Sequence, residues 1–451
     1  MMVRGAVEGS CISLDTLRLN CNHRLPRDCG ESGAKKIVLN HNIFQAQAKR
    51  CPETGSTTAT ATATRARGPV TVLQVLPALG GSGGVERGTV EIAGCITKYG
   101  WNSLVASNGG ERVYQLQRAG AEHFELPLHS KNPFVIYANI GRLVRLIREQ
   151  NVDIVHVRSR APAWSAYYAC KRTGTKFITT FHGTYGAEGG FKRAYNQVMA
   201  KGDLVIAISK FIAGHLKQLY GAAGDKIRVI HRGVDIDTFD KAKVSAERVV
   251  KLASDWRLED GYPVVMLPGR LTRWKGQGVF VEAVAKLGRK DIRCVLVGSD
   301  QGRSGYRREL DRLITRYDLN DVVRIVDHCD DMPAAYMLAD VVVSASTDPE
   351  AFGRVVIEAQ ALGRMVVAPD HGGARETIIP GQTGWLVKPG DQDALAAALG
   401  EALSLDKDER QAFADRAINS VRNHFSKATM CAKTLAVYEE VLTMTAKDGK
   451  A

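Results

Sequence analysis

Short runs of β-branched and other apolar residues alternate with helical patterns along most of this chain, and this alternation limits the folds that it can adopt. In the first half the runs are VTVLQVLP, NSLVASN, VDIVHVRS, KFITTFHG and DLVIAIS, at residues 70–77, 102–108, 152–159, 176–183 and 203–209. Strands that are buried on both faces read as nearly continuous apolar runs, and intervening helices connect them in parallel. We therefore expect an α/β domain with a doubly wound parallel sheet.

The same pattern starts again in the second half of the chain. Its runs are YPVVMLPGR, IRCVLVGSD, VVRIVDH, DVVVSAS and RMVVAPD, at residues 262–270, 292–300, 322–328, 340–346 and 364–370. Between the halves, residues 235–260 are charged and weakly patterned, which is typical of a connector. A length of 451 residues is also sufficient for two cores. We predict two Rossmann-like domains, at residues 69–245 and 246–425, followed by a helical segment at residues 426–451.

The first 68 residues differ from the rest, because they lack a clear period and end in the low-complexity tract TGSTTATATATRARG at residues 54–68. Such a tract cannot bury enough apolar surface to offset the entropy cost of ordering. Residues 1–68 are expected to be either a disordered extension or the product of a misassigned start codon.

Charge and cysteine content bear on partners and compartment. The formal net charge of +13 indicates an anionic partner, which could be nucleic acid, a phosphorylated metabolite or an acidic membrane surface. No nucleic-acid-binding motif is visible, so we expect no nucleic acid partner. The nine cysteines form no CxxC pair and no zinc-ligand spacing, which predicts reduced thiols and no metal site. Without an apolar run long enough to span a membrane, or a signal-peptide core, the chain is expected to be cytoplasmic.

In parallel sheets, ligands bind at the carboxyl ends of strands, so the loops after the predicted strands are the candidate sites. The first strand is followed by PALGGSGGVERG at residues 77–88, where Gly83 and Gly84 would let the backbone approach a ligand closely. The spacing fits neither a dinucleotide fingerprint nor a P-loop, and a flexible turn is the alternative. His182, in FHGTYG, also follows a strand and could hydrogen-bond a substrate hydroxyl or be structural.

The first strand of the second half is followed by LPGRLTRWKGQ at residues 267–277. Arg270, Arg273 and Lys275 in this loop could neutralise a diphosphate without a metal. The alternative is a solvated basic turn.

Two glutamates frame the stretch PEAFGRVVIEA, residues 349–359. We predict that Glu350 lies in a loop and Glu358 one turn into a helix, whose first N–H groups would seat an anionic phosphate. Both carboxylates could then accept hydrogen bonds from sugar and ribose hydroxyls. A glycosidase would instead need one of them as a proton donor with a raised pKa. The neighbouring cations and helix N-terminus favour transfer from a nucleotide sugar over hydrolysis.

These motifs together resemble the retaining glycosyltransferases of family 4, which have the GT-B fold and include lipopolysaccharide-core and phosphatidylinositol-mannosyl transferases. The resemblance covers about residues 70–445 and rests on EAFGRVVIE, GRLTRWKG, GGSGGVE, HGT and GGARETI with GQTGWLVKPGD. It implies two Rossmann-like domains facing a central cleft, the first for the acceptor and the second for the donor, with the C-terminal helix crossing back onto the first. It also implies a nucleoside-diphosphate sugar as co-substrate, with no cofactor and no metal.

The resemblance also implies a role for each motif residue. Arg270 and Lys275 would bind the donor diphosphate, and Glu350 and His182 would hold and orient the transferred sugar. Backbone groups of the loop would assist Glu350, and the remaining donor contacts would come from Glu358, on the ribose hydroxyls, and from the glycine loop. The loop residues are Ala351, Phe352 and Gly353, and the glycines are Gly83 and Gly84.

The acceptor is the least defined part of this prediction. The segment KNPFVIYANIGRLVRLIREQ at residues 131–150 has three arginines beside an apolar face, which suits an anionic membrane or, as the favoured alternative, an ordinary helix with a charged outer face. The family adds a glycan or lipid-linked acceptor, a role in lipopolysaccharide or other cell-envelope glycan biosynthesis, and a location at the inner face of the cytoplasmic membrane. The alternatives are a GT-B-like phosphorylase, a sugar-nucleotide epimerase or a non-catalytic sugar-nucleotide binder.

Overall fold

The computed structural model describes residues 68–80, 83–185, 190–258, 260–302 and 304–444. The predictions about residues 1–67 lie outside this part of the chain.

The first half of the described chain forms a seven-stranded parallel sheet in the order β3-β2-β1-β4-β5-β6-β7. Its strands are β1 (Thr71–Val75), β2 (Asn102–Ser107), β3 (Glu122–Glu125), β4 (Ile154–Val157), β5 (Lys176–Phe181), β6 (Leu204–Ala207) and β7 (Ile227–Val229). Every residue of β1, β4 and β6 is buried, as their nearly continuous apolar runs predict. In the centre, Val72 of β1 lies between Ser103 of β2 and Ile154 of β4.

The second half forms a six-stranded parallel sheet within the described residues, in the order β10-β9-β8-β11-β12-β13. Its strands are β8 (Val264–Pro268), β9 (Arg293–Val297), β10 (Val323–Val326), β11 (Val341–Val343), β12 (Met365–Pro369) and β13 (Trp385–Val387). Val265 of β8 pairs with Cys294 of β9 on one side and with Val341 of β11 on the other. The two parallel sheets confirm the predicted pair of doubly wound domains.

Helices connect the strands of each sheet. In the first half they are α1 (Gly84–Lys98), α2 (Val113–Arg118), α3 (Pro133–Glu149), α4 (Ala163–Thr173), α5 (Gly190–Asn196) and α6 (Lys210–Tyr220), with the 3-10 helices η1 (Gln197–Ala200) and η2 (Gly224–Lys226). Further along are η3 (Lys241–Lys243), α7 (Ala246–Asp255), η4 (Arg273–Lys275), α8 (Gln277–Leu287), α9 (Ser304–Arg316), α10 (Met332–Leu338), α11 (Arg354–Ala361), α12 (Ala374–Thr377), α13 (Gln392–Ser404), α14 (Lys407–His424) and α15 (Lys427–Thr443).

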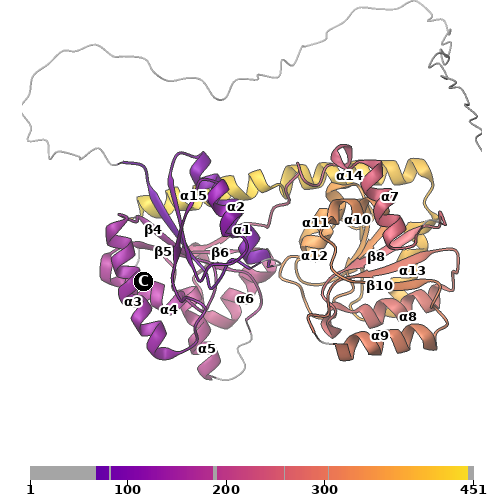
Figure 1. Ribbon diagram of the computed structural model, residues 1–451, viewed down its shortest axis with the longest axis horizontal. Coiled ribbons are helices and arrows are strands. Elements are labelled where there is room, and N and C mark those ends of the chain that lie inside the picture. Colours follow the sequence, from indigo (N-terminus) through magenta and orange to yellow (C-terminus); the bar gives the residue numbers. More distant parts are fainter. Residues whose placement is uncertain (1–67, 81–82, 186–189, 259, 303, 445–451) are drawn as a thin grey trace, which may run out of the picture. The chain divides into compact units, whose positions relative to one another are not determined.

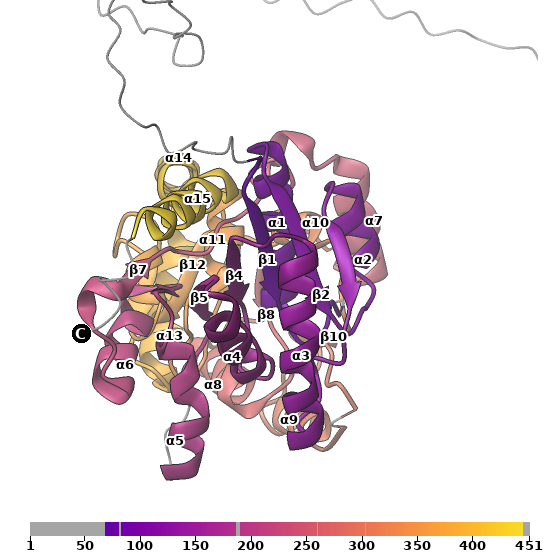
Figure 2. The same ribbon diagram turned by 90° about the vertical axis from the view of Figure 1, so that its left-hand side faces the viewer.

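Helix α3 shows how the local sequence specifies a helix. The Asn132 side chain accepts a hydrogen bond from the Phe134 N–H, and Pro133 occupies the first turn, where a missing N–H costs nothing. Ile140 and Leu143, three positions apart, are buried on one face. This face packs beside α4 (Figure 2). The segment therefore covers the sheet, as the favoured alternative predicts, and leaves its arginines in solvent.

Helix α15 crosses back onto the first domain, where it lies beside α1 (Figure 1). Ser426 caps it by accepting a hydrogen bond from the Thr429 N–H at 3.1 Å. Further along, the Tyr438 hydroxyl lies 2.7 Å from Nδ1 of buried His156, whose Nε2 lies 2.6 Å from the Thr180 hydroxyl. This docking confirms the crossing helix that the sequence predicts.

One sequence prediction about the cysteines is wrong. Cys95 of α1 and Cys431 of α15 form a disulfide with a Cα–Cα distance of 6.1 Å, so the expectation of reduced thiols does not hold for this pair. The two cysteines are 336 positions apart, and only the docking of α15 on α1 brings them together. Cys170, Cys294 and Cys329 are free and buried.

The connector prediction is also incomplete. Residues 235–260 contain η3 and a ten-residue helix, α7, capped by the Ser245 side chain. Helix α7 has no fully buried residue and packs against α10, which explains its weak apolar pattern.

Candidate functional site

Both sheets have a point where the strand order reverses. In the first sheet β1 separates β2 from β4, and in the second β8 separates β9 from β11. Loops that leave the carboxyl ends of strands at such a point diverge, which opens a crevice for a ligand. The loops that follow β1, β8 and β11 carry the glycine, basic and two-glutamate motifs respectively.

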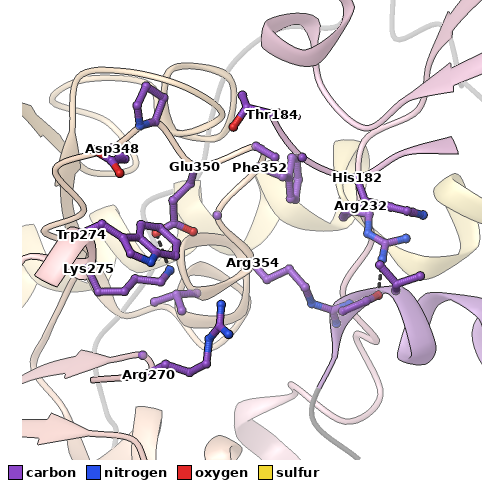
Figure 3. A pocket seen from close by; sticks show the side chains of 18 residues that line it. His182, Thr184, Arg232, Arg270, Trp274, Lys275, Asp348, Glu350, Phe352 and Arg354 are labelled. Atoms are coloured by element: carbon purple, nitrogen blue, oxygen red, sulfur yellow. Dashed lines mark hydrogen bonds and ion pairs between the residues drawn. The ribbon is translucent and has the colours of Figure 1, made fainter. Parts of the chain in front are cut away.

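A cavity of about 610 Å³ lies among these loops (Figure 3). The predicted site residues that line it are Gly84, His182, Arg270, Lys275, Glu350, Ala351, Phe352 and Gly353. An adjoining cavity of about 920 Å³ is lined by the other two, Gly83 and Glu358, and shares Gly84 and Arg354 with the first. The fold thus brings all ten predicted residues to one region, although their roles remain predictions.

The loop after β8 turns Lys275 into the cavity. It contains η4 and ends at Gly276, which has φ +75°. A Cβ at this position would lie 1.8 Å from the Ala345 carbonyl oxygen, so only glycine fits. This close approach brings the basic loop against the loop after β11.

Lys275 and Glu350 form an ion pair at the cavity wall, with Nζ 2.7 Å from Oε1 (Figure 3). Their side chains are 14% and 20% exposed, so water screens the pair only weakly. The Ser346 hydroxyl also donates to Glu350 Oε1 at 2.5 Å, and that of Ser344 at 3.3 Å. Burial alone would raise the pKa of Glu350, but Lys275 and the two serines outweigh burial and hold that pKa below its ordinary value. Glu350 is therefore ionised at neutral pH.

Two glycines of the GGARETI motif support the loop that carries Glu350. A Cβ on Gly372 would lie 2.4 Å from the Glu350 carbonyl oxygen, and one on Gly373 would lie 2.3 Å from the Phe352 Cα. The Gly373 N–H donates to that same Glu350 carbonyl at 2.8 Å. The motif thus explains how the loop is held, a role that the sequence alone does not reveal.

Helix α11 begins at Arg354, and its N-cap, Gly353, adopts a left-handed conformation with φ +81° and offers no side-chain cap. The Val356 N–H donates to the Gly353 carbonyl oxygen at 3.2 Å, so the N–H groups of Arg354 and Val355 are the ones that could face an anion. The structure confirms that Glu350 lies in the loop and Glu358 one turn into the helix.

Glu358 is 8% exposed and its carboxylate is enclosed by donors. Oε2 accepts from the Tyr336 hydroxyl at 3.2 Å, and Oε1 accepts from Arg354 Nε at 3.2 Å and from Arg87 Nη1 at 3.4 Å. Arg354 also lies near Glu91, with Nη2 3.9 Å from Oε1. Glu358 is thus a fixed hydrogen-bond acceptor at the adjoining cavity.

His182 follows β5 on the opposite side of the cavity from Lys275 (Figure 3). Both of its ring nitrogens are enclosed and have no hydrogen-bond partner within the described chain. Burial, and then the nearby guanidinium groups of Arg232 and Arg158, lower the pKa of His182 well below its ordinary value. The neutral imidazole can donate from one nitrogen and accept at the other, as recognition of a sugar hydroxyl requires.

The structure corrects the prediction for Arg273. Its side chain is 73% exposed and forms an ion pair with Glu309 at 2.5 Å, so it points to solvent instead of into the cavity. In its place, the ring of Trp274 lines the cavity and lies 4.5 Å from Lys275 Nζ.

Sequence reasoning missed two other cations of the cavity. The Arg354 side chain is not part of the predicted site, and Arg232 lies in the loop after β7, a strand that the sequence pattern did not predict. The signal that could have found Arg232 is its position just beyond the short apolar run IRVI.

Two further searches cover only the described residues. In that part of the chain, no helix is long and apolar enough to cross a membrane. Nor do these residues contain a group of three or more His, Cys, Asp or Glu side chains placed to hold a metal ion.

Comparisons with known proteins agree with the predicted family and fold. A family model described as glycosyl transferases group 1 matches residues 251–420, and one described as glycosyltransferase family 4 matches residues 82–238. A crystal structure of a glycosyltransferase from Rickettsia africae ESF-5 is 41% identical, covers 84% of this chain and 100% of that chain, and superposes with a TM-score of 0.78.

Two curated relatives match more distantly. A D-inositol 3-phosphate glycosyltransferase of Xylanimonas cellulosilytica is 32% identical over 272 residues, which are 56% of this chain and 64% of the relative. A GDP-mannose-dependent alpha-(1-6)-phosphatidylinositol monomannoside mannosyltransferase of Mycolicibacterium smegmatis is 28% identical over 282 residues, which are 58% of this chain and 70% of the relative. The chain thus spans less than two thirds of the length of the first.

Proposed function

The chain belongs to the family 4 glycosyltransferases of the GT-B fold, and on this premise we propose that it transfers a hexose from a nucleoside-diphosphate sugar to an acceptor hydroxyl, with retention of anomeric configuration and without a metal ion. The observation that carries the proposal is the cavity wall in which Arg270, Lys275 and the N-terminus of α11 meet.

The donor diphosphate would bind at this wall. Arg270 is exposed to the cavity, and no carboxylate pairs with it among the described residues. Lys275 shares its charge with Glu350 and retains two further N–H donors for a phosphate oxygen. With the first N–H groups of α11, these cations place positive charge where the leaving diphosphate gains negative charge.

The proposed transfer step uses this arrangement. The bond between the anomeric carbon and the phosphate oxygen breaks, and the nucleoside diphosphate leaves with the electron pair. The acceptor oxygen attacks the anomeric carbon from the same face, and its proton passes to the departing phosphate oxygen. Stabilising that oxygen is the main catalytic contribution of Arg270 and Lys275.

The carboxylates would hold hydroxyl groups and not transfer protons. The lowered pKa of Glu350 argues against a general acid, which must be protonated at working pH. Glu350 would instead accept hydrogen bonds from the transferred sugar, with His182 orienting it and the Ala351–Gly353 backbone assisting. Glu358, held by Arg354 and Tyr336, would accept from the ribose hydroxyls in the adjoining cavity.

For the acceptor we propose a glycan or lipid-linked hydroxyl of cell-envelope biosynthesis, presented at the cytoplasmic face of an anionic membrane. The relatives named for inositol phosphate and phosphatidylinositol mannoside acceptors support this class. On α3, Phe134 and Tyr137 are 84% and 69% exposed and lie one helical turn apart, and Lys131 and Arg145 of the same segment are also exposed. Exposed aromatic rings with flanking cations suit a membrane interface.

Vesicle sedimentation tests the membrane contact. Wild type should bind vesicles that contain phosphatidylserine and not pure phosphatidylcholine vesicles, and Phe134→Ser/Tyr137→Ser should bind more weakly. Equal binding of wild type and variant would remove α3 from the proposal.

A transfer assay tests the proposed activity. UDP-, GDP- and ADP-sugars are incubated with inositol phosphate and lipid-linked acceptors, with and without a chelator, and the anomeric configuration of the product is determined by NMR. We expect transfer with retention, unchanged by the chelator. Product that forms only with inorganic phosphate would indicate a phosphorylase. A donor sugar that is altered in the absence of acceptor would indicate an epimerase, and donor binding without turnover would indicate a non-catalytic protein.

A further inference from the structure

Arg232 is a buried guanidinium at the edge of the cavity, without an acidic partner. It follows β7, is 6% exposed and lines the cavity together with His182 (Figure 3). Its Nη2 donates to the Gly84 carbonyl oxygen, and among the described residues no carboxylate lies within ion-pair distance of it. Burying such a charge is costly unless a counter-ion is present.

A second buried guanidinium, that of Arg158, lies near Arg232. Arg158, after β4, is 3% exposed and donates to the neutral Gln74 side chain at 3.3 Å, while its Nε has no partner within the described chain. Arg158 and Arg232 border the same small internal cavity of about 10 Å³. Burial, and then Arg158 and Arg354, lower the pKa of Arg232 to about 9, although Glu91 and Glu86 oppose the shift. Among the described residues, neither of these two guanidinium groups forms an ion pair.

The fold also reserves space for the Arg232 side chain. Gly88 lies in the second turn of α1, where glycine is unfavourable relative to alanine. A Cβ at Gly88 would lie 2.4 Å from Nη1 of Arg232 and 2.8 Å from Nη2. Gly88 therefore costs helix stability, and its missing side chain leaves the space that the Arg232 guanidinium occupies at the cavity edge.

We infer that Arg232 forms a second anion subsite in the cavity, which binds a carboxylate or phosphate group carried by the acceptor or by the transferred sugar. The inference rests on the proposed transfer reaction, in which the donor diphosphate would bind at the loops of the second sheet. Arg232 lies in the loop after β7 of the first sheet, across the cavity from Lys275 (Figure 3). A planar guanidinium suits two-point binding of either group.

The experiment measures whether inorganic phosphate binds in addition to a nucleoside diphosphate. UDP, GDP and ADP are first tested for thermal stabilisation of the wild-type protein, and phosphate is then titrated with the best of them at saturation. We expect phosphate to raise the thermal midpoint further in wild type. In Arg232→Met the phosphate Kd should rise by about tenfold or more, since a hydrogen-bonded charge is lost.

Two variants separate binding from folding. Arg232→Met removes an unpaired buried charge but keeps much of the volume, so the thermal midpoint without ligand should stay level or rise. Gly88→Ala should displace the guanidinium and weaken phosphate binding while the helix itself gains propensity. Matched controls are Arg364→Met, a half-buried arginine that donates to the Leu362 and Ala339 carbonyls, and Gly141→Ala, a helical glycine with open space around it. Both controls should keep the wild-type phosphate Kd.

Two pairs of probes identify the source of the anion in nature. UDP-glucose is compared with UDP-glucuronate for a charge on the sugar, and myo-inositol with inositol 3-phosphate for a charge on the acceptor. Arg232→Met should reduce the preference for the charged member of the relevant pair.

The possible failures are distinct. If no nucleoside diphosphate stabilises wild type, the proposed function fails and the subsite falls with it. If a nucleoside diphosphate binds but phosphate adds nothing, or binds equally to Arg232→Met, only the subsite is overturned. A lower thermal midpoint in Arg232→Met with unchanged phosphate binding would show that Arg232 is structural.

Discussion

Replacing Lys275 with alanine should abolish transfer far more than it weakens the fold. The ammonium lies 2.7 Å from Glu350 and faces the proposed diphosphate, so its loss removes one charge from the leaving group. Losing one preorganised donor of this kind costs about 2.7–4 kcal/mol of transition-state stabilisation, or about 100- to 1000-fold in kcat.

The effect on stability should be smaller, for a reason visible in the structure. Breaking a fully buried ion pair costs about 3–5 kcal/mol, because the remaining charge is left alone. Here Ser344 and Ser346 still donate to Glu350, and its side chain is 20% exposed. We therefore expect a loss of about 1–3 kcal/mol in the free energy of unfolding.

Steady-state transfer kinetics and urea denaturation measure the two quantities on the same preparations. Arg273→Ala is the matched control, because it removes a cation from the same loop that points to solvent. The double variant Lys275→Met/Glu350→Gln should recover much of the stability that Lys275→Ala loses, without recovering transfer activity. Wild-type turnover in Lys275→Ala, or an equal loss in Arg273→Ala, would refute the reasoning.

Three further predictions concern the scaffold around the site. Glu350 and Glu376 both have a pKa below the ordinary 4.5, because their ion-pair and hydrogen-bond partners outweigh burial. The unfolded chain therefore binds more protons than the folded protein as the pH drops below about 4.5. A series of denaturation curves should show the free energy of unfolding falling in this range, and falling less steeply in Glu350→Gln. Gly276→Ala should lower the free energy of unfolding by about 3–5 kcal/mol, because φ is left-handed there and the new Cβ would clash with Ala345. Gly288→Ala, at φ +68° but with open space around it, should lower that free energy by only about 1–2 kcal/mol. Equal urea midpoints for the two variants would contradict this prediction. Tyr438→Phe leaves Nδ1 of buried His156 without its hydrogen-bond partner and should lower the free energy of unfolding by about 1–3 kcal/mol. Tyr99→Phe, which removes an exposed hydroxyl paired with Glu439, should change that free energy by less than about 0.5 kcal/mol, and equal effects of the two variants would mean that the buried contact does not anchor α15.

The central strands were predictable from the sequence because both of their faces are buried. A strand such as β1 or β8 then reads as a nearly continuous apolar run. The strands missed are β3, β7 and β13, which lie at sheet edges and have partly exposed residues. A short edge strand needs only a few apolar side chains, so its run is too brief to distinguish from a loop.

The site residues were predictable where a motif sits at the carboxyl end of a recognisable strand. Glu350 and Lys275 meet that condition, and the fold brings them to 2.7 Å. Arg232 follows a missed strand, and Arg273 differs from Lys275 only in the direction that η4 gives its side chain. The disulfide could not be predicted from the sequence, because it joins segments that only tertiary packing brings together.

The central claim is that Arg270 and Lys275 bind the donor diphosphate. Calorimetric titration tests it by comparing a nucleoside diphosphate with the corresponding monophosphate, in wild type, in Arg270→Ala/Lys275→Ala and in Arg273→Ala. The account predicts that wild type and Arg273→Ala bind the diphosphate more tightly than the monophosphate by about 100-fold or more, and that the double variant loses this preference. A double variant that keeps the preference of wild type would contradict the account.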